Sequence, residues 1–218
     1  MSSPNVKSLL FAEFARVSKA LGSGNRLELL EFLAQGERSV DALAKLSGLS
    51  VANTSRHLQV LRQAGLVAAR KEGLFVHYSV SGEGVIRLLA ALQEVAQHNV
   101  AEVDKLVNTY LTSKDSLEPV TVKDLADRMR SGLVTVIDVR PPEEYAAGHL
   151  LGAINIPVAD LKKNMAKLPR GREVVAYCRG PFCLLSFEAV AQLRSKGLQA
   201  RRLETGYPEW KVAGLPVE

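Results

Sequence analysis

SVANTSRHLQVLRQAGLVAARKEGLFVHYSV, at residues 50–80, contains the signals for a helix and a β-hairpin in direct succession. Ser50 is a typical helix N-cap, and a helix is expected to run from it to Ala64, just before a glycine stop. The apolar side chains expected to face inward are Val51, Leu58 and Leu61. Two strand-like runs follow at residues 66–70 and 75–80, with a Glu-Gly turn between them. A hairpin placed directly after a helix in this way is a wing.

Three helices are expected ahead of this segment, over residues 6–21, 26–35 and 39–48. The third is short, with a serine N-cap and a glycine stop. Only a Gly48-Leu49 turn separates it from the next helix. Two short helices joined by a tight turn form a helix-turn-helix, so this half is expected to be a mostly α winged helix-turn-helix.

The charged residues of this half are arranged as a DNA-binding surface. Between residues 50 and 77 positive side chains outnumber negative ones. The N-terminal half of a recognition helix usually reaches base edges, whereas basic residues at a wing tip bind phosphates. For each residue taken singly, an ordinary solvated charge is the alternative. The candidate DNA-binding residues are Ser50, Asn53, Thr54, Arg56, His57, Arg70 and Lys71.

Residues 84–112 carry apolar side chains at helical spacing over their whole length. A single helix of this length measures on the order of 40 Å, and one small domain cannot bury so long a stripe. We therefore expect a homodimer formed through the first helix and the 84–112 helix. A two-fold dimer suits a double-stranded DNA operator with two half-sites.

Residues 20–82 resemble the ArsR/SmtB family of dimeric winged-helix repressors. The resemblance rests on SVANTSRHLQVLRQAGLV at residues 50–67 and on the wing RKEGLFVHY at residues 70–78. It implies a transcriptional repressor that a ligand or a thiol reaction releases from its operator.

The metal sites of that family are not matched. Metal-sensing members often carry a Cys-x-Cys at the third helix, where this sequence reads SVDALAKLSG without cysteine. The 84–112 helix offers His98 and Glu102, which are i,i+4 neighbours, and also Asp104. Two ligands per protomer are too few for a closed tetrahedral site unless a dimer supplies two more, and a solvated polar face explains them equally well. We therefore predict no metal site.

The composition changes at SKDSLEP, residues 113–119, which is expected to link domains at 1–112 and 120–218. Strands and helices alternate beyond it, which is typical of an α/β layer with a largely parallel sheet. The expected strands are residues 135–139, 154–157, 173–177 and 199–203. The expected helices are residues 121–131, 143–147, 158–168 and 184–196.

The strand at 173–177 leads into the loop CRGPFC, residues 178–183, and a helix begins directly after it. Ligands bind at the carboxyl ends of strands in open α/β sheets, and a helix N-terminus favours an anion. This placement lowers the pKa of a cysteine to between about 3.5 and 7.5. Cys178 is therefore predicted to be a thiolate nucleophile, with a small buried hydrophobic residue as the alternative.

Residues 120–218 resemble a single-domain rhodanese. The motifs are DVRPPEEYAAGHLLGAINIP (138–157), CRGPFC, and LETGYPEWKVAGLPV (203–217). The resemblance implies sulfur transfer through a persulfide on Cys178. Under this resemblance Asp138 and Arg140 have either a structural role, as hydrogen-bonding residues at a strand end, or a catalytic one. Trp210 is expected to lie in the core. The active-site loop would consist of Cys178, Arg179, Gly180, Pro181, Phe182 and Cys183.

One position of the loop departs from that pattern. Many rhodanese loops end in an arginine, as do the longer loops of related phosphatases and arsenate reductases, whereas this loop ends in Cys183. Phosphate or arsenate chemistry is therefore not expected. Arg179, inside the loop, is expected to replace part of the missing positive charge in binding thiosulfate. Cys183 is a candidate resolving thiol for a persulfide on Cys178. The alternative is an unreactive residue in the first turn of the helix.

The whole sequence fits two domains, with 218 residues and a net charge of +5. Apolar runs long enough for a membrane span, about 18 residues or more, do not occur, and the start lacks the features of a signal peptide, so a cytoplasmic protein is expected. Its two cysteines, Cys178 and Cys183, favour chemistry over a structural disulfide in a reducing compartment.

These features predict a DNA-binding repressor in which Cys178 senses or transfers sulfane sulfur from a donor such as thiosulfate or polysulfide. No cofactor is expected. One alternative is a rhodanese-type sulfurtransferase with an accessory DNA-binding domain. Another is a thiol-based repressor that responds to oxyanions or arsenic through both cysteines. The fusion favours the first, because the DNA-binding half has no cysteine of its own.

Overall fold

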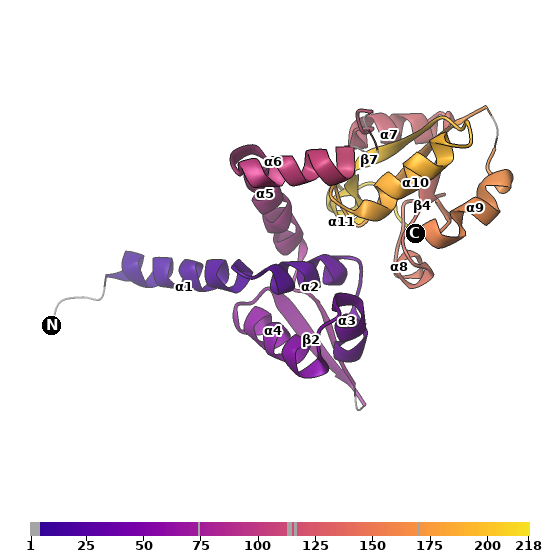
Figure 1. The fold of residues 1–218 in the computed structure, drawn as a ribbon. Helices are drawn as coiled ribbons and strands as arrows, with labels where there is room; N and C mark the ends of the chain where they lie inside the picture. Colours follow the sequence, from indigo (N-terminus) through magenta and orange to yellow (C-terminus); the bar gives the residue numbers. More distant parts are fainter. Residues whose placement is uncertain (1–4, 74, 113–114, 116, 170) are drawn as a thin grey trace. The chain divides into compact units, whose positions relative to one another are not determined.

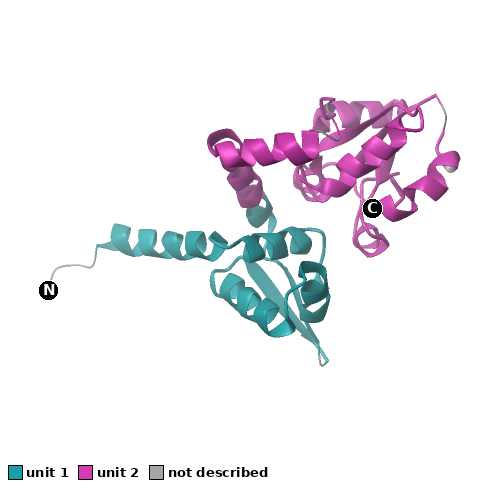
Figure 2. Ribbon diagram, viewed as in Figure 1, with its two compact units in different colours: residues 1–86 teal, residues 87–218 magenta. Residues whose placement is uncertain are grey.

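The computed structural model describes residues 5–218 except 74, 113–114, 116 and 170 (Figure 1). Two compact units, Met1–Ile86 and Arg87–Glu218, divide the protein (Figure 2). The predicted segment 113–119 lies partly outside the described residues, so it stays a prediction as a linker. The expected fold class is confirmed, because a winged-helix unit is followed by an α/β unit that has a parallel sheet.

The first unit has helices followed by a small antiparallel sheet. Its strands lie in the order β1-β3-β2, and β2 and β3 form the predicted wing. The two-residue strand β1, which extends the wing sheet, was not predicted. The elements are α1 Val6–Leu21, α2 Gly24–Ala34, β1 Arg38–Ser39, α3 Val40–Ser47, α4 Val51–Gln63, β2 Val67–Glu72 and β3 Phe75–Val80.

The caps of α3 and α4 produce the predicted helix-turn-helix. The Ser39 hydroxyl accepts a hydrogen bond from the Ala42 amide at 3.2 Å, which begins α3. Gly48 follows α3 with a φ of 69°, the left-handed conformation that favours glycine. The Ser50 hydroxyl accepts from the Asn53 amide at 3.3 Å and begins α4. The turn between the two helices is therefore as short as the sequence predicts.

Helix α4 buries one narrow stripe against its unit. Thr54, Leu58 and Leu61 are fully buried, at i, i+4 and i+7. Val51 is 50% exposed, so its predicted inward position is wrong. Thr54 is the residue that continues the stripe into the first turn.

The predicted single helix over residues 84–112 is also wrong. Val100 takes an extended conformation, with φ −112° and ψ 99°, and interrupts the helix. Just before it, the Asn99 side chain donates to the Val95 carbonyl at 2.9 Å. A β-branched residue that follows an asparagine thus stands where a glycine or proline usually marks such a stop. The segments are α5 Glu83–Asn99, α6 Ala101–Leu106 and a π-helix at Val107–Thr112.

The second unit includes most of α5, all of α6 and the π-helix, and beyond them a four-stranded parallel sheet in the order β5-β4-β6-β7. The four strands and their largely parallel arrangement were predicted, whereas the strand order was not. The expected helix over residues 158–168 is instead three short turns, and α11 was missed because its sequence begins Tyr-Pro. The strands are β4 Val134–Asp138, β5 Ile154–Asn155, β6 Glu173–Cys178 and β7 Ala200–Gly206. The helical elements are α7 Val122–Arg130, α8 Pro142–Ala146, η2 Val158–Asp160, α9 Leu161–Asn164, η3 Met165–Lys167, α10 Leu184–Arg194 and α11 Tyr207–Val212.

Strand β6 is buried on both faces and divides the core in two. Val174, Ala176 and Cys178 face the cluster covered by α9 and α10. Val175 and Tyr177 face the cluster covered by α7 and α11 (Figure 1). This alternation follows from the two-residue period of a strand. It places the Cys178 sulfur on the α10 side of the sheet and the Tyr177 ring on the opposite side.

The buried stripe of α4 yields a stability prediction. Leu58→Ala should destabilise the first unit by about 2 to 5 kcal/mol, because it removes a fully buried side chain and leaves a cavity. Val51→Ala should change stability by less than about 0.5 kcal/mol, because the side chain is half exposed. Helix circular dichroism in urea measures both, while the fluorescence of Trp210, the single tryptophan, follows the second unit and should not change. Equal effects of the two substitutions would contradict the assigned face.

Candidate functional site

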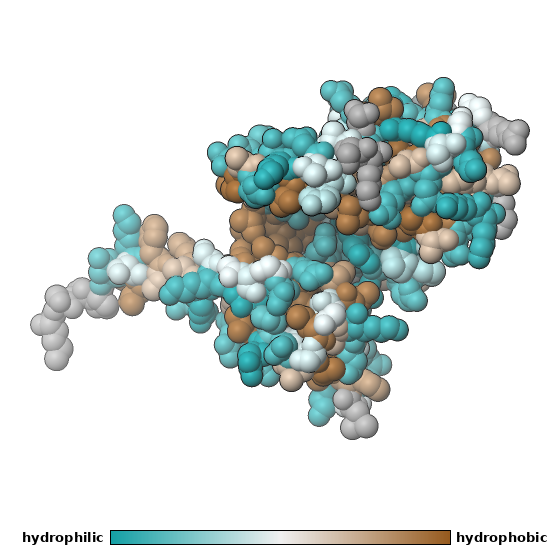
Figure 3. Space-filling view, in the orientation of Figure 1, coloured by the Kyte–Doolittle hydropathy of each residue, from teal (hydrophilic) through white to brown (hydrophobic). Residues whose placement is uncertain are grey.

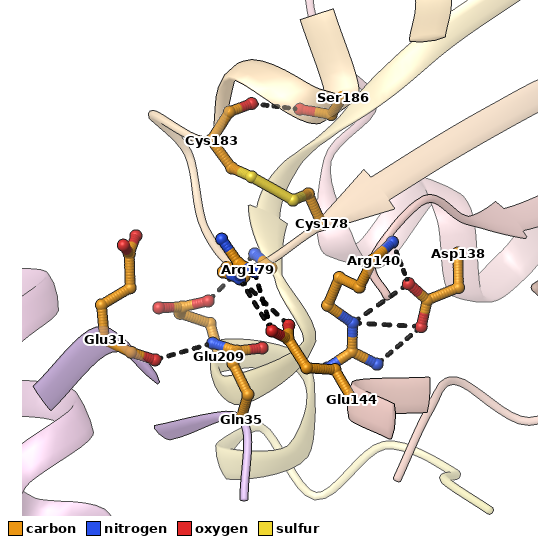
Figure 4. The surroundings of a disulfide bond; sticks show 11 residues. Glu31, Gln35, Asp138, Arg140, Glu144, Cys178, Arg179, Cys183, Ser186 and Glu209 are labelled. Carbon is orange, nitrogen blue, oxygen red and sulfur yellow. Dashed lines mark hydrogen bonds and ion pairs between the residues drawn. A yellow bond between two sulfur atoms is a disulfide. The ribbon is translucent and has the colours of Figure 1, made fainter. Parts of the chain in front are cut away.

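Cys178 ends the central strand β6, and the loop 178–183 leads directly into α10 (Figure 4). Cys183 is the N-cap residue of α10. The loop turns on a hydrogen bond from the Cys183 amide to the Gly180 carbonyl at 3.2 Å. The Ser186 hydroxyl donates to the Cys183 carbonyl at 3.0 Å. Both cysteines are buried, so the loop presents its sulfur atoms at the interior edge of the sheet and not on the open surface.

The two cysteines are joined by a disulfide (Figure 4). Their Cα atoms are 6.2 Å apart, within the range that a disulfide spans. The sequence left open whether the two sulfur atoms meet, and the loop brings them together. The nucleophilic thiolate predicted for Cys178 belongs to the reduced state of this pair and stays a prediction.

A buried ion pair lies at the neighbouring strand end. Arg140 donates to both carboxylate oxygens of Asp138, at 2.6 to 3.1 Å, and both side chains are fully buried. The Tyr177 hydroxyl donates to the same carboxylate at 2.5 Å. Burial and the nearby Asp138 carboxylate raise the pKa of Tyr177, which keeps the hydroxyl protonated as a donor. Asp138 and Arg140 therefore have the strand-end hydrogen-bonding role, and Trp210 is core as predicted.

Arg179, inside the loop, is held by a carboxylate that the sequence analysis did not single out. Its guanidinium forms three contacts of 2.8 to 3.1 Å with both oxygens of Glu144. Glu144 lies on α8 and is 1% exposed, whereas the adjacent Glu143 is exposed. Both glutamates occur in the DVRPPEEY motif, but the helix phase that turns one of them inward is set only by the packing of α8.

The loop is also supported from β7 by a close backbone approach. A Cβ atom at Gly206 would lie 2.3 Å from the carbonyl carbon and oxygen of Arg179 and 2.5 Å from the Gly180 nitrogen. Only glycine therefore fits at the end of β7. In the sequence, Gly206 can be recognised as the glycine of the LETGYPEW motif.

The predicted DNA-binding residues divide into exposed and structural groups. Asn53 and Arg56 are exposed on α4 and His57 is partly exposed, whereas the Ser50 hydroxyl caps the helix. Thr54 corrects the prediction of an accessible side chain, because it is fully buried and its hydroxyl donates to the Ser50 carbonyl at 3.0 Å.

The basic residues of the wing, Arg70 and Lys71, are both exposed on β2. Arg70 bonds Glu37 at 2.5 Å and Glu72 at 2.8 Å, so its charge is shared with two carboxylates. Its hydrogen bond to Glu37 holds the pKa of that carboxyl below its usual value. Glu37 was not predicted as a partner of the wing, because 33 residues separate it from Arg70 in the sequence.

The residues weighed as metal ligands do not gather into a site. His98 lies on α5 and Glu102 on α6, on opposite sides of the break at Val100. The Nδ1 atom of His98 lies 2.8 Å from the Glu94 carbonyl oxygen. Across the described residues, no group of three or more His, Cys, Asp or Glu side chains is arranged to hold a metal ion. None of the described helices has the length and apolar character needed to cross a membrane.

Helix-turn-helix, wing and cysteine loop define the class: a winged-helix DNA-binding regulator joined to a rhodanese-like domain. The model for the bacterial regulatory protein arsR family matches residues 23–69, and the rhodanese-like domain model matches residues 121–213. The HTH-type transcriptional regulator Rv0324 of Mycobacterium tuberculosis is 45% identical over 97% of this chain and 93% of its own length. The protein belongs to the ArsR family of transcriptional regulators, in a form that carries a C-terminal rhodanese domain.

Other relatives match less than half of the chain. A probable mercury resistance operon repressor of Streptomyces lividans is 36% identical over 41% of this chain and 72% of its own length. A sulfurtransferase of Allochromatium vinosum is 33% identical over 38% of this chain and 78% of its own length. The homodimeric winged helix-turn-helix domain Mb0332 of Mycobacterium bovis is 43% identical, with a TM-score of 0.43, and the match covers 46% of this chain and 93% of that one.

The buried ion pair beside the loop yields the second prediction. Asp138→Asn should destabilise the second unit by about 3 to 5 kcal/mol, because it leaves the buried Arg140 guanidinium without its counter-charge. Asp127→Asn is the matched control and should cost less than about 1 kcal/mol, because the Asp127–Arg130 pair is exposed. Trp210 fluorescence in urea measures both. A loss in Asp138→Asn no larger than in the control would contradict the role assigned to the buried pair.

Proposed function

We propose that this regulator is a homodimeric repressor whose affinity for operator DNA is set by the sulfur state of Cys178. The observation that carries the proposal is the Cys178–Cys183 disulfide within the loop, in a protein whose other residues include no cysteine. A signal that acts through thiols must therefore enter at this loop. In a cytoplasmic setting, where thiols are kept reduced, such a short-range disulfide is a transient state and suits a sensor.

The proposed chemistry has two steps. The Cys178 thiolate attacks the outer sulfur of a persulfide R-S-SH, which forms Cys178-S-SH and releases R-S⁻. The Cys183 thiolate then attacks the inner sulfur of that persulfide, which forms the Cys178–Cys183 disulfide and releases HS⁻. Atoms and charge balance in each step, and the donor is the oxidant. A cellular thiol resets the pair by disulfide exchange.

A homodimer is proposed from the apolar face of α1. This face carries side chains that are each more than half exposed in the single protomer, and Figure 3 shows hydrophobic residues along this helix. An exposed apolar stripe of this kind is typical of an interface. Three further exposed apolar side chains lie on α5, at Leu88, Leu92 and Val95. The exposed residues on α1 are Val6, Leu9, Leu10, Phe11 and Phe14.

The exposed N-terminal half of α4 yields the third prediction. Arg56→Ala should weaken DNA binding by about 1 to 3 kcal/mol if its guanidinium contacts a base edge in the major groove. Gln63→Ala, an exposed residue at the other end of α4, is the control and should leave binding unchanged. Fluorescence anisotropy on DNA selected from a random-sequence pool measures both. Equal binding by Arg56→Ala and the parent would remove Arg56 from the interface.

The two-step chemistry yields the fourth prediction, read by intact-mass spectrometry of the reduced protein after exposure to glutathione persulfide. The parent should lose two hydrogen atoms as the disulfide forms. Cys183→Ser should instead retain one added sulfur atom on Cys178, and Cys178→Ser should retain none. The parent's DNA affinity should change with the modification, whereas that of Cys178→Ser should not. Unchanged affinity in a parent that has formed the disulfide would exclude the sensor function.

A sulfurtransferase enzyme is the second candidate, favoured by the likeness of the second unit to the Allochromatium vinosum sulfurtransferase. An enzyme must pass the outer sulfur of Cys178-S-SH to an acceptor before Cys183 closes the loop. The two functions therefore predict different effects of Cys183→Ser: the substitution removes the disulfide that a sensor needs, whereas an enzyme does not need Cys183 for transfer. Steady-state transfer from thiosulfate to cyanide that persists in the parent, together with DNA affinity that ignores the sulfur state, would favour the enzyme.

A further inference from the structure

Arg179 is the one charged residue in CRGPFC, and its charge is compensated. Its guanidinium bonds both oxygens of Glu144, and its side chain is 16% exposed. A bidentate pair of this kind is strong and fixes the orientation of the guanidinium. The sequence suggested that Arg179 replaces the arginine that this loop lacks, but Glu144 supplies an equal negative charge beside it.

The second arginine near the loop is compensated in the same way. Arg140 and Asp138 form a fully buried pair at the adjacent strand end. These two arginines and two carboxylates sum to zero charge, and Glu209, whose carboxylate accepts a hydrogen bond from the Gly206 amide against the Arg179 backbone, adds no positive charge (Figure 4). The backbone N–H groups at the start of α10 attract an anion with partial charges only.

Sulfur donors differ in the charge that such a site must accept. Thiosulfate is a dianion, and its reaction with a thiolate, R-S⁻ + S-SO₃²⁻ → R-S-S⁻ + SO₃²⁻, brings three negative charges together and releases a sulfite dianion. The sulfane sulfur of a small persulfide carries at most one charge, and its transfer releases one thiolate. Like charges in a partly buried site raise the barrier steeply, since the local dielectric constant is low.

We propose that the Glu144–Arg179 ion pair makes Cys178 selective for small-molecule persulfides over thiosulfate, with Glu144 as the specificity-determining residue. This inference rests on the proposed persulfide formation at Cys178 and adds the class of donor. Glu144 acts by cancelling the Arg179 charge and by fixing the orientation of that guanidinium. The role is assigned to Glu144 because this residue is buried against the loop, whereas Glu143, one residue earlier on α8, is exposed.

The test uses the full-length reduced protein in a Cys183→Ser background, so that a persulfide on Cys178 accumulates and is counted by intact mass. Initial rates are measured separately with the persulfide of 2-mercaptoethanol, whose single charge lies on its sulfur, and with sodium thiosulfate. The background protein should react faster with the persulfide. Glu144→Gln keeps a hydrogen-bond acceptor for Arg179 but removes the negative charge, so it should raise the thiosulfate rate relative to the persulfide rate by about tenfold or more. Salt should weaken this gain.

Two controls separate charge from disruption of the loop. Glu143→Gln makes the same chemical change at the exposed neighbour and should leave the ratio of the two rates unchanged. Adding Arg179→Gln to Glu144→Gln removes both charges, so the ratio should return to that of the background protein. A loss of both rates in every variant at position 144 would mark damage to the loop and would overturn the charge assignment.

Three further outcomes would contradict the proposed selectivity. A background protein that takes sulfur from thiosulfate as fast as from the persulfide overturns the selectivity and leaves the proposed sensor intact. A ratio of thiosulfate rate to persulfide rate that Glu144→Gln leaves unchanged also overturns the selectivity and leaves the proposed sensor intact. A background protein that takes sulfur from neither donor overturns the proposed function, and this inference with it.

Discussion

The buried Asp138 carboxylate is the interaction on which the rhodanese unit depends. It ends β4 and accepts hydrogen bonds from Arg140 on its own strand end and from Tyr177 on β6. A buried charge must be paired and hydrogen-bonded, because an isolated one costs several kcal/mol or more. Because Asp138 on β4 must accept the Tyr177 hydroxyl from β6, the carboxyl ends of these two strands are aligned side by side. Since Tyr177 precedes Cys178, the same requirement fixes where the loop leaves the sheet.

The loop itself is constrained from three directions. Gly206 at the end of β7 touches the backbone of Arg179, Glu144 on α8 holds its guanidinium, and Cys183 occupies the N-cap position of α10. A change in the bond between Cys178 and Cys183 therefore acts on an N-cap and on an ion pair together. Because packed interiors do not deform continuously, a loop held in this way suits a two-state signal.

The sequence predicted features that local chemistry controls. Capping residues located α3 and α4, short apolar runs located the strands, and the Gly-Pro loop before a helix located Cys178. The misses are features that packing controls. Thr54 continues the buried stripe of α4 in place of Val51, and Val100 interrupts a periodic apolar pattern without glycine or proline. Glu144 could be found as one of two adjacent glutamates, but only the orientation of α8 shows which one contacts the loop.

The size of the required signal constrains how this loop can control DNA binding. An operator that changes from mostly occupied to mostly free needs an affinity change on the order of 100-fold, or about 2.7 kcal/mol. Even the loss of a side-chain N-cap hydrogen bond, which Cys183 does not make, costs only about 0.5 to 2 kcal/mol, so one loop alone falls short of that change. In the proposed symmetric dimer two copies would double the contribution, because both protomers would bind one operator. The dimer would then be part of the sensing mechanism, because it turns a modest change at each cysteine pair into a change in operator occupancy.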